Sequence, residues 1–260
     1  MSGKAISFAN VSHQFDSHRA GEPPVTVLQP TTVTIESQQF VALVGPSGCG
    51  KTTILNMVAG LVKPSTGTVT LDGHAPRIGD PDVGYLLARD ALLPWRTARL
   101  NIALPLEVRG SPRREREERA YNALASVGLA NYADAYPAQL SHGMRQRVAV
   151  ARTLVTEPTT LLMDEPFSAL DAQTRLSLQQ QFLQLWEQHR STVIFVTHDL
   201  TEAILMADRV IVFSARPGAI KADFSVGLAR PRSLAQLQGS KDFLDLFQRV
   251  WTVFRGGVEI

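Results

Sequence analysis

The chain has 260 residues, of which 44% are hydrophobic, and this is enough for one large globular domain with a buried core. Lys and Arg number 26 against 24 Asp and Glu, so no overall basic field indicates a nucleic acid partner. The single cysteine, Cys49, excludes an intramolecular disulfide. No apolar run approaches the roughly 18 residues of a membrane span, so at a membrane another protein must supply the helices.

The N-terminal third predicts strands of two kinds. The segments "KAISFANV" and "PVTVLQPTTVTIE" alternate apolar and polar residues, as half-buried antiparallel strands do. The run "FVALV" is apolar throughout, which is typical of a parallel strand buried on both faces. A glycine-rich turn follows it, and "KTTILNMVAGL" then predicts a helix.

The rest of the chain alternates helices and strands. Residues 97–136 have a helical pattern, with Ser111 as a predicted cap, Pro112 at the first helical position and Gly128 at a helix end. The runs "TLLMD" and "TVIFVT" predict buried strands that each lead into a helix. A hairpin in "VIVFSARPGAIKADFSV" and a closing helix near "SKDFLDLFQRVWTVF" complete an α/β core with a parallel sheet, a β flank and a helical insertion.

The segment "GPSGCGKT", residues 45–52, carries the most specific chemistry. It fits the pattern G-x-x-x-x-G-K-[ST] between a strand and a helix, the context in which such a loop binds phosphates. Glycines let successive N–H groups point at a polyphosphate, Lys51 adds a positive charge, and the Thr52 hydroxyl can bind Mg²⁺. A chance glycine-rich turn is the alternative, and the matched flanks disfavour it.

Two adjacent acids end the strand in "TLLMDEP". Asp164 can hold Mg²⁺ directly or through water. A second carboxylate beside it, Glu165, adds repulsion without structural gain, but it can orient the water that attacks a γ-phosphate. The pair therefore favours hydrolysis over binding alone, although a solvated acid at a strand end is the alternative for Glu165.

His198 follows the strand in "TVIFVTHD", and a parallel sheet would bring it to the same edge as the two acids. A lone histidine is usually a structural residue. Beside a γ-phosphate, its imidazole could instead donate a hydrogen bond to the developing charge and help to orient Glu165.

A second helix start lies in "LSHGMRQR", residues 140–147, where Ser141 can cap a helix whose free N–H groups favour an anion. One chain thus contains two predicted phosphate sites. The motifs "GPSGCGKT", "LSHGMRQR", "LLMDEP", "SALD" and "VTHD", in this order, resemble the nucleotide-binding subunit of ATP-binding cassette (ABC) transporters over essentially the whole chain.

The resemblance implies a P-loop NTPase core and an explanation for the two sites. In that family two subunits pair head to tail, so Ser141 and Gly143 of one subunit complete the site on the partner's loop. Asp171 resembles the residue that crosses this interface, and Phe15 resembles the aromatic residue that stacks on adenine. A core phenylalanine is the alternative for Phe15.

The resemblance thus implies ATP and Mg²⁺ as cofactors, with Glu165 and His198 as catalytic residues and Thr52 and Asp164 as metal ligands. The residues implied to bind ATP are Phe15, Gly45, Pro46, Ser47, Gly48, Cys49, Gly50, Lys51, Thr52, Thr53, Ser141, Gly143 and Asp171. Residues 1–260 form one domain: 1–96 and 158–226 are mainly β flank and core, 97–157 the helical subdomain, and 227–260 a helical tail.

Two positions depart from the family pattern. His142 stands where glycine is usual; a tolerated solvent-side replacement is favoured over a protonatable donor near the γ-phosphate. Ala88, in "LLARDALLPW", stands where the family has a glutamine that contacts Mg²⁺ and the attacking water. A methyl group can do neither, so either water substitutes or coupling depends on other residues.

The segments "LLPWRT" and "SARPGAI" resemble the branch that serves importers of nitrate, taurine and alkanesulfonates. Trp95 either packs inside the helical piece or contacts a short helix of a membrane partner. The resemblance implies a homodimer at the cytoplasmic face of the cell membrane, bound to integral permease subunits and served by a periplasmic solute-binding protein. The alternatives are a cassette ATPase that acts outside transport and a scaffold that binds ATP with little hydrolysis.

Overall fold

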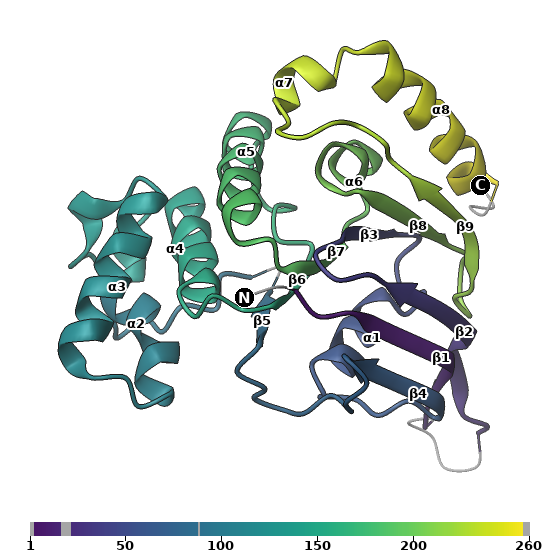
Figure 1. Cartoon of the computed structure of the whole chain (residues 1–260), viewed down its shortest axis with the longest axis horizontal. Coiled ribbons are helices and arrows are strands. Elements are labelled where there is room, and N and C mark those ends of the chain that lie inside the picture. Colours follow the sequence, from purple (N-terminus) through teal and green to yellow (C-terminus); the bar gives the residue numbers. More distant parts are fainter. Residues whose placement is uncertain (1–2, 17–21, 88, 257–260) are drawn as a thin grey trace.

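The computed structural model describes residues 3–16, 22–87 and 89–256 (Figure 1). It contains two sheets. The smaller has the strand order β2-β1-β4 and is antiparallel, as the alternating pattern predicts. Its strands are β1 (Ile6–Phe15), β2 (Val25–Ile35) and β4 (Thr66–Leu71).

The larger sheet has the order β5-β6-β7-β3-β8-β9. All neighbours are parallel except β8 and β9, which form the predicted hairpin. The residues of β3 and β7 are all buried, which confirms strands covered on both faces. The strands are β3 (Phe40–Val44), β5 (Val83–Leu86), β6 (Thr160–Asp164), β7 (Thr192–Val196), β8 (Arg209–Phe213) and β9 (Ile220–Ser225).

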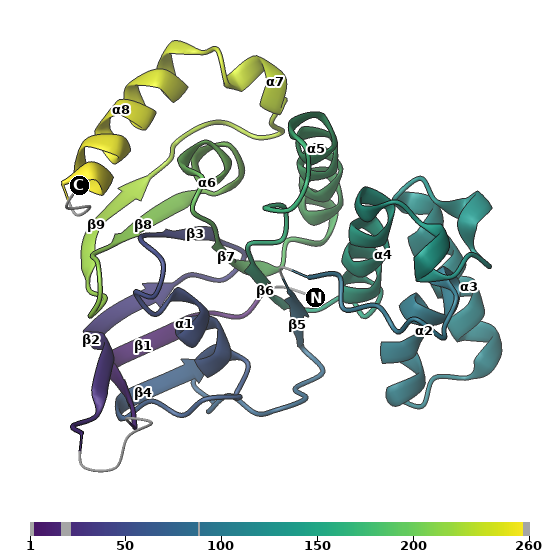
Figure 2. The ribbon, with the colours of Figure 1, turned by 180° about the vertical axis from the view of Figure 1, so that it is seen from behind.

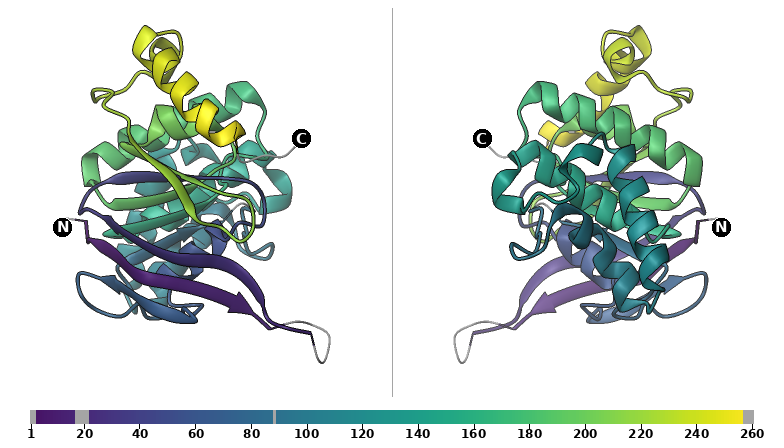
Figure 3. Two further views of the ribbon diagram at one scale, coloured as in Figure 1. Left: turned by 90° about the vertical axis from the view of Figure 1, so that its right-hand side faces the viewer. Right: turned by 90° about the vertical axis from the view of Figure 1, so that its left-hand side faces the viewer.

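Helices cover both faces of the larger sheet. One face packs against α1 and the smaller sheet, and the other packs against α5, α6 and α8 (Figures 1 and 2). Figure 3 shows the smaller sheet and α8 at opposite ends of this layered arrangement. These helices are α1 (Lys51–Val58), α5 (Ala172–His189), α6 (Leu200–Met206), α7 (Leu234–Leu237) and α8 (Lys241–Arg255).

The remaining helices form a separate apolar cluster beside β5 and β6 (Figure 1). They are α2 (Ala98–Val108), α3 (Arg113–Ser126), α4 (His142–Leu154) and the short 3₁₀ turns η1 (Ala130–Tyr132) and η2 (Pro137–Gln139). Within the described part of the chain, no helix is both long and apolar enough to cross a bilayer.

One predicted helix start is wrong by one position. Pro112 is the N-cap of α3 rather than its first helical residue, and Ser111 therefore precedes the cap. The cause is the extended conformation of Pro112, whose ψ is 144°, and no side chain caps this helix. Gly128 follows the end of the helix at φ +74°, as predicted.

Candidate functional site

The loop between β3 and α1 has the geometry of a phosphate-binding loop. Gly48 and Gly50 have φ of +79° and +96°, in the left-handed region that glycine adopts without steric cost. Gly50 is the N-cap of α1, and no side chain caps this helix. The first N–H groups of α1 therefore have no side-chain acceptor, and the helix dipole favours an anion in front of them.

Lys51 lies across this loop. Its ammonium group donates to the carbonyl oxygens of Gly45 and Pro46 at 2.7 and 2.9 Å, and its side chain is buried. The loop thus has a positive charge in contact with its own backbone, next to the start of α1. This is the charge that a polyphosphate needs at such a helix start.

Thr52 and Asp164 come together from α1 and the end of β6. The Thr52 hydroxyl lies 3.0 Å from one carboxylate oxygen of Asp164 and 3.2 Å from the other. Burial raises the pKa of Asp164, and the neighbouring Glu165 raises it further. A nearby cation would favour the ionised carboxylate.

The donor set fits Mg²⁺. A hydroxyl and a carboxylate at one point are oxygen ligands, and Mg²⁺ is usually bound by few protein groups together with water and phosphates. Among the described residues, no group of three or more His, Cys, Asp and Glu side chains could hold a metal ion. Water and nucleotide phosphates would supply the remaining oxygens.

Glu165 and His198 lie at the ends of the neighbouring strands β6 and β7. The His198 Nδ1 atom is 3.1 Å from a Glu165 carboxylate oxygen, and the two side chains are 63% and 34% exposed. Glu165 has a φ of +45°, an unfavourable conformation for a residue with a Cβ, and its N–H donates to the Val196 carbonyl. The strained backbone thus turns a carboxylate away from the buried strand and toward His198.

A cavity of about 460 Å³ lies between the phosphate-binding loop and Glu165. Phe15 and Val27 lie at its wall, and Phe15 is 46% exposed, so its interpretation as a core residue is wrong. The cavity is lined by Phe15, Val27, Ser47, Gly48, Gly50, Lys51, Thr52, Thr53, Glu165, Val196 and Arg216. An apolar wall and a floor of backbone amides suit a nucleotide, whose base is flat and whose phosphates are charged.

Comparison with known proteins identifies the family. A sequence profile of the ABC transporter family matches residues 28–168, more than half of the chain. The chain belongs to the ABC transporter family. It is therefore an ATP-binding subunit, and its activity is ATP hydrolysis.

Individual relatives agree with this assignment. An uncharacterized ABC transporter ATP-binding protein of Methanocaldococcus jannaschii is 43% identical, over 90% of this chain and 86% of its own length. The taurine import ATP-binding protein TauB of Rhizobium johnstonii is 44% identical over 79% of each chain. A dimeric ATP-binding cassette in a post-hydrolysis state with ADP and Pi has a TM-score of 0.75 and 32% identity, over 86% of this chain and 100% of its own. These neighbours confirm the predicted cassette fold.

The second predicted phosphate site of this ABC subunit, at the start of α4, lies away from the cavity. The Ser141 hydroxyl caps α4 by accepting the Met144 N–H at 3.2 Å, as predicted, and it does not line the cavity. A Cβ on Gly143 would lie 2.8 Å from the Thr174 methyl group, so α4 approaches α5 closely here. One chain therefore does not bring its two predicted phosphate sites together (Figure 1).

The ring of His142 contradicts the solvent-side interpretation. Its Nδ1 lies 3.3 Å from the Arg145 guanidinium, which can only donate, so Nδ1 accepts and Nε2 carries the proton. Nε2 is buried and has no partner among the described residues. His142 thus packs at the start of α4.

Asp171 is exposed and caps α5, where it accepts the Thr174 N–H at 3.0 Å. That hydrogen bond lowers the pKa of Asp171. The carboxylate therefore stays charged at the start of α5, close in sequence to Thr174, which contacts Gly143. Its predicted role across a dimer interface stays a prediction.

Sequence reasoning missed two features of the site. Arg216 lines the cavity although the prediction used "SARPGAI" only as a mark of the importer branch. Glu202, buried in α6, accepts hydrogen bonds from Thr197 and Gln179 and so connects the residue before His198 to α5. The sequence contains an acidic residue in α6, but it does not indicate that this residue is hydrogen-bonded to Gln179 of α5. Ala88 lies outside the described residues, so its predicted place at the position of the family's glutamine stays a prediction.

Proposed function

We propose that this subunit hydrolyses ATP to power uptake of a small solute of the nitrate, sulfonate or taurine type. The observation that carries the proposal is that Glu165 lines the same cavity as the phosphate-binding loop and lies 3.1 Å from His198. A carboxylate 3.1 Å from an imidazole nitrogen can orient a water molecule and accept its proton.

Each group has one part in the proposed reaction. The loop amides and Lys51 bind the phosphates; Thr52 and Asp164 would hold Mg²⁺, which would supply positive charge for the phosphate oxygens. Glu165 accepts a proton from the attacking water, and His198 donates a hydrogen bond to the γ-phosphate. Phe15 stacks on the adenine ring at the apolar wall of the cavity.

We propose that the active form is a head-to-tail dimer with two composite sites. The support is the separation of Ser141 and Gly143 from the cavity of their own chain. Because Ser141 uses its oxygen to accept the Met144 N–H, its O–H proton remains available for a γ-phosphate of the partner's ATP. Asp171 faces solvent at the start of α5, where a partner chain can reach it.

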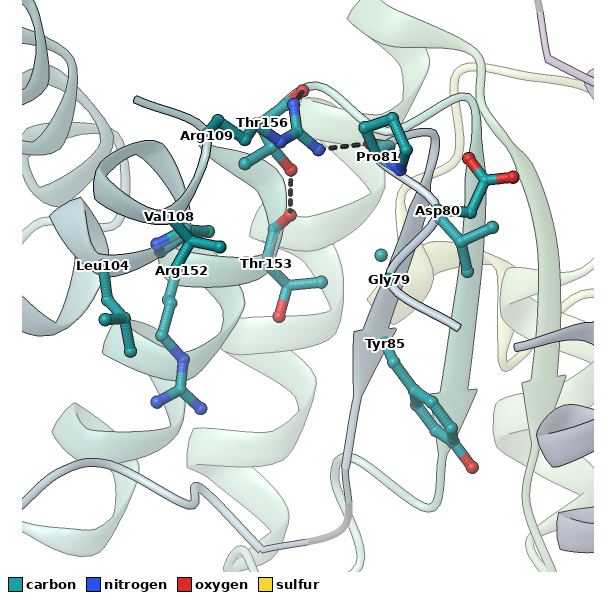
Figure 4. Close-up of a pocket in the computed structure, with 13 residues that line it drawn as sticks. Gly79, Asp80, Pro81, Tyr85, Leu104, Val108, Arg109, Arg152, Thr153 and Thr156 are labelled. Atoms are coloured by element: carbon teal, nitrogen blue, oxygen red, sulfur yellow. Dashed lines mark hydrogen bonds between the residues drawn. The ribbon is translucent and has the colours of Figure 1, made fainter. Parts of the chain in front are cut away.

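We further propose that the surface around α2 meets a membrane permease. Trp95 is 70% exposed, which contradicts its packing inside the helical piece, and Val108 at the end of α2 is 80% exposed. A hollow of about 420 Å³ lies beside Val108, lined by residues of α2, β5 and the end of α4. Figure 4 shows the residues that line it. An exposed apolar side chain beside a hollow, as at Val108, favours a protein partner, and the exposed Trp95 precedes the start of the same helix. Such a partner would place the subunit at the cytoplasmic face of the cell membrane.

The solute class rests on relatives. The taurine import protein of Rhizobium johnstonii and the nitrate import ATP-binding protein NrtD of a Synechocystis strain are 44% and 41% identical to this chain. In the proposed importer a periplasmic solute-binding protein delivers the solute, and this subunit never touches it.

The test is a phosphate-release assay on the subunit with and without the permease encoded beside its gene. We expect co-purification with the permease and hydrolysis that rises when the loaded solute-binding protein is added. Failure to co-purify with any integral membrane protein would favour a cassette ATPase outside transport. Tight ATP binding with negligible hydrolysis even in the complex would favour a scaffold.

A further inference from the structure

The loop between β8 and β9 is fixed against the nucleotide cavity. The Gly218 N–H donates to the Val27 carbonyl and the Gln29 N–H donates to the Gly218 carbonyl, both at 2.8 Å. A Cβ on Gly218 would lie 1.9 Å from the Cys49 carbonyl oxygen, so this loop touches the phosphate-binding loop directly. The β8–β9 loop is thus attached both to the cavity wall and to the cavity floor.

Internal hydrogen bonds also fix the conformation of this loop. The Ser214 N–H donates to the Ala219 carbonyl at 2.8 Å, and the Ala219 N–H donates to the Ser214 hydroxyl at 2.9 Å. The residues between them, including Arg216, therefore project from a closed turn. An arginine on such a base loses less conformational freedom on binding than one on a free loop.

Arg216 lines the cavity and is unpaired. Its side chain is exposed, and its guanidinium has no hydrogen bond or ion pair with any other residue among 3–16, 22–87 and 89–256. Other arginines nearby on β8 and after β9 are paired: Arg209 with Asp223, and Arg230 with Asp208. The planar guanidinium carries five donors and a permanent positive charge, so it can donate to two oxygens of a tetrahedral phosphate group.

The position of the β8–β9 loop indicates which part of a bound nucleotide Arg216 can reach. Phe15 and Val27 mark the apolar end of the cavity, and the start of α1 marks the end for the terminal phosphates. The β8–β9 loop is attached to Val27 at the apolar end and to Cys49 in the phosphate-binding loop, so it spans the region from the apolar end toward the phosphates. We propose that Arg216 binds the phosphate nearest the ribose and so contributes equally to the binding of ATP and ADP. This proposal rests on the ATP site of the proposed function.

The test measures the dissociation constants of ATP and ADP for wild type, Arg216→Ala and Arg216→Lys. For Arg216→Ala we expect both constants to rise by about 3- to 10-fold, a factor of ten corresponding to 1.4 kcal/mol. Arg216→Lys should recover most of the loss, because an ammonium group also binds phosphate as a point charge. The loss should shrink at high salt, and in hydrolysis it should fall on KM more than on kcat.

Controls separate this proposal from the ATP site itself. Arg114→Ala removes an exposed arginine of α3 that has no hydrogen bond or ion pair within the described part of the chain, and it should leave both constants unchanged. Lys51→Ala should abolish most binding; if it does not, the proposed ATP site is wrong. If Lys51→Ala abolishes binding and Arg216→Ala changes neither constant, only the role of Arg216 is overturned.

Other outcomes also overturn it. A loss for ATP without a loss for ADP would place the guanidinium at the γ-phosphate. An equal loss in Arg216→Lys and Arg216→Ala would indicate stacking of the guanidinium plane rather than a charge contact. Circular dichroism and the melting temperature check that each variant remains folded.

Discussion

The starts of the helices α1 and α4 differ in whether a side chain caps their free N–H groups. The start of α1 is uncapped, follows a left-handed glycine and opens into a cavity with Lys51 and Glu165. The start of α4 is capped by Ser141, and its Gly143 packs against Thr174. The first has most features of a phosphate site within one chain, whereas the second has satisfied its Met144 N–H and, in the proposed dimer, would contribute to the site of a second chain.

Helix α5 connects the two regions. Its first turn contains Thr174, the neighbour of Gly143, and Arg175, which lies 3.6 Å from Asp199 beside His198. In α4, Gln146 donates to the carbonyl of Pro166, the residue after Glu165, at 2.5 Å. Contacts from α4 and α5 therefore link the start of α4 to the residues beside Glu165 and His198.

The sharpest test of the α1 region is Glu165→Gln. The amide keeps the size of the side chain but cannot accept a proton, so we expect turnover to fall by roughly two to four orders of magnitude. ATP-bound dimers should then accumulate on a sizing column. Glu118→Gln, an exposed position on α3, is the matched control. Turnover that stays at the wild-type rate would remove Glu165 from the mechanism.

Mixing two defective proteins tests whether the two regions belong to one composite site. Lys51→Ala damages the α1 region, Ser141→Arg damages the α4 region, and a mixed dimer keeps one site without either defect. In an equal mixture about half of the dimers combine the two variants, and each of these has one intact site of two. We therefore expect roughly a quarter of all sites to be intact. The measurement is ATP-dependent dimerisation at several mixing ratios. Failure to recover at every ratio would contradict head-to-tail sharing.

Ala88→Gln tests how complete the α1 site is without the glutamine of the family. The amide would add a ligand for Mg²⁺ and a hydrogen bond toward water, each worth about 1 kcal/mol. We expect basal hydrolysis or Mg²⁺ affinity to rise by no more than about tenfold. The ATPase rate against Mg²⁺ concentration, with and without permease, measures this. A wild type that is inert with its permease and revived about a thousandfold would favour the scaffold.

Gly143→Ala tests the packing of the α4 start. The new Cβ would crowd the Thr174 methyl group, so we expect the free energy of unfolding to fall by about 1 kcal/mol. Thr174→Ser removes that methyl group and should relieve the loss in the double variant. Gly48→Ala is the contrast in the α1 region, because its cost comes from φ +79° and no neighbour lies within 4 Å. Urea unfolding of the single and double variants measures the coupling.

The smallest expected effect concerns Glu202, which joins α5 to the strand end before His198. Burial raises the pKa of Glu202, so the folded state binds its proton more tightly than the unfolded state. Wild-type stability therefore falls as the pH rises above the ordinary glutamate pKa of 4.5, until the folded state also loses its proton. Glu202→Gln lacks this titration, and its stability relative to wild type should increase with pH. A pH-independent difference would contradict the assignment.

Several features were predictable because they depend on neighbours in the sequence. The run "FVALV", the glycines after it and Lys51 occur within one strand–turn–helix unit, so the phosphate-binding loop follows from local pattern. The same is true of the Ser141 cap and the β8–β9 hairpin. Ser111 was misplaced because a cap depends on the exact ψ of Pro112, which spacing does not fix.

The tertiary structure alone decided which distant groups meet. The order β6-β7-β3 brings Asp164 within 3.0 Å of Thr52 and Glu165 within 3.1 Å of His198, and no local pattern specifies a strand order. It exposed Phe15 and Trp95, for which burial and exposure were equally compatible with sequence. It also set Arg216 at the cavity, because hydrogen bonds from β2 and close contact with Cys49 fix that loop, and both partners lie more than a hundred residues away.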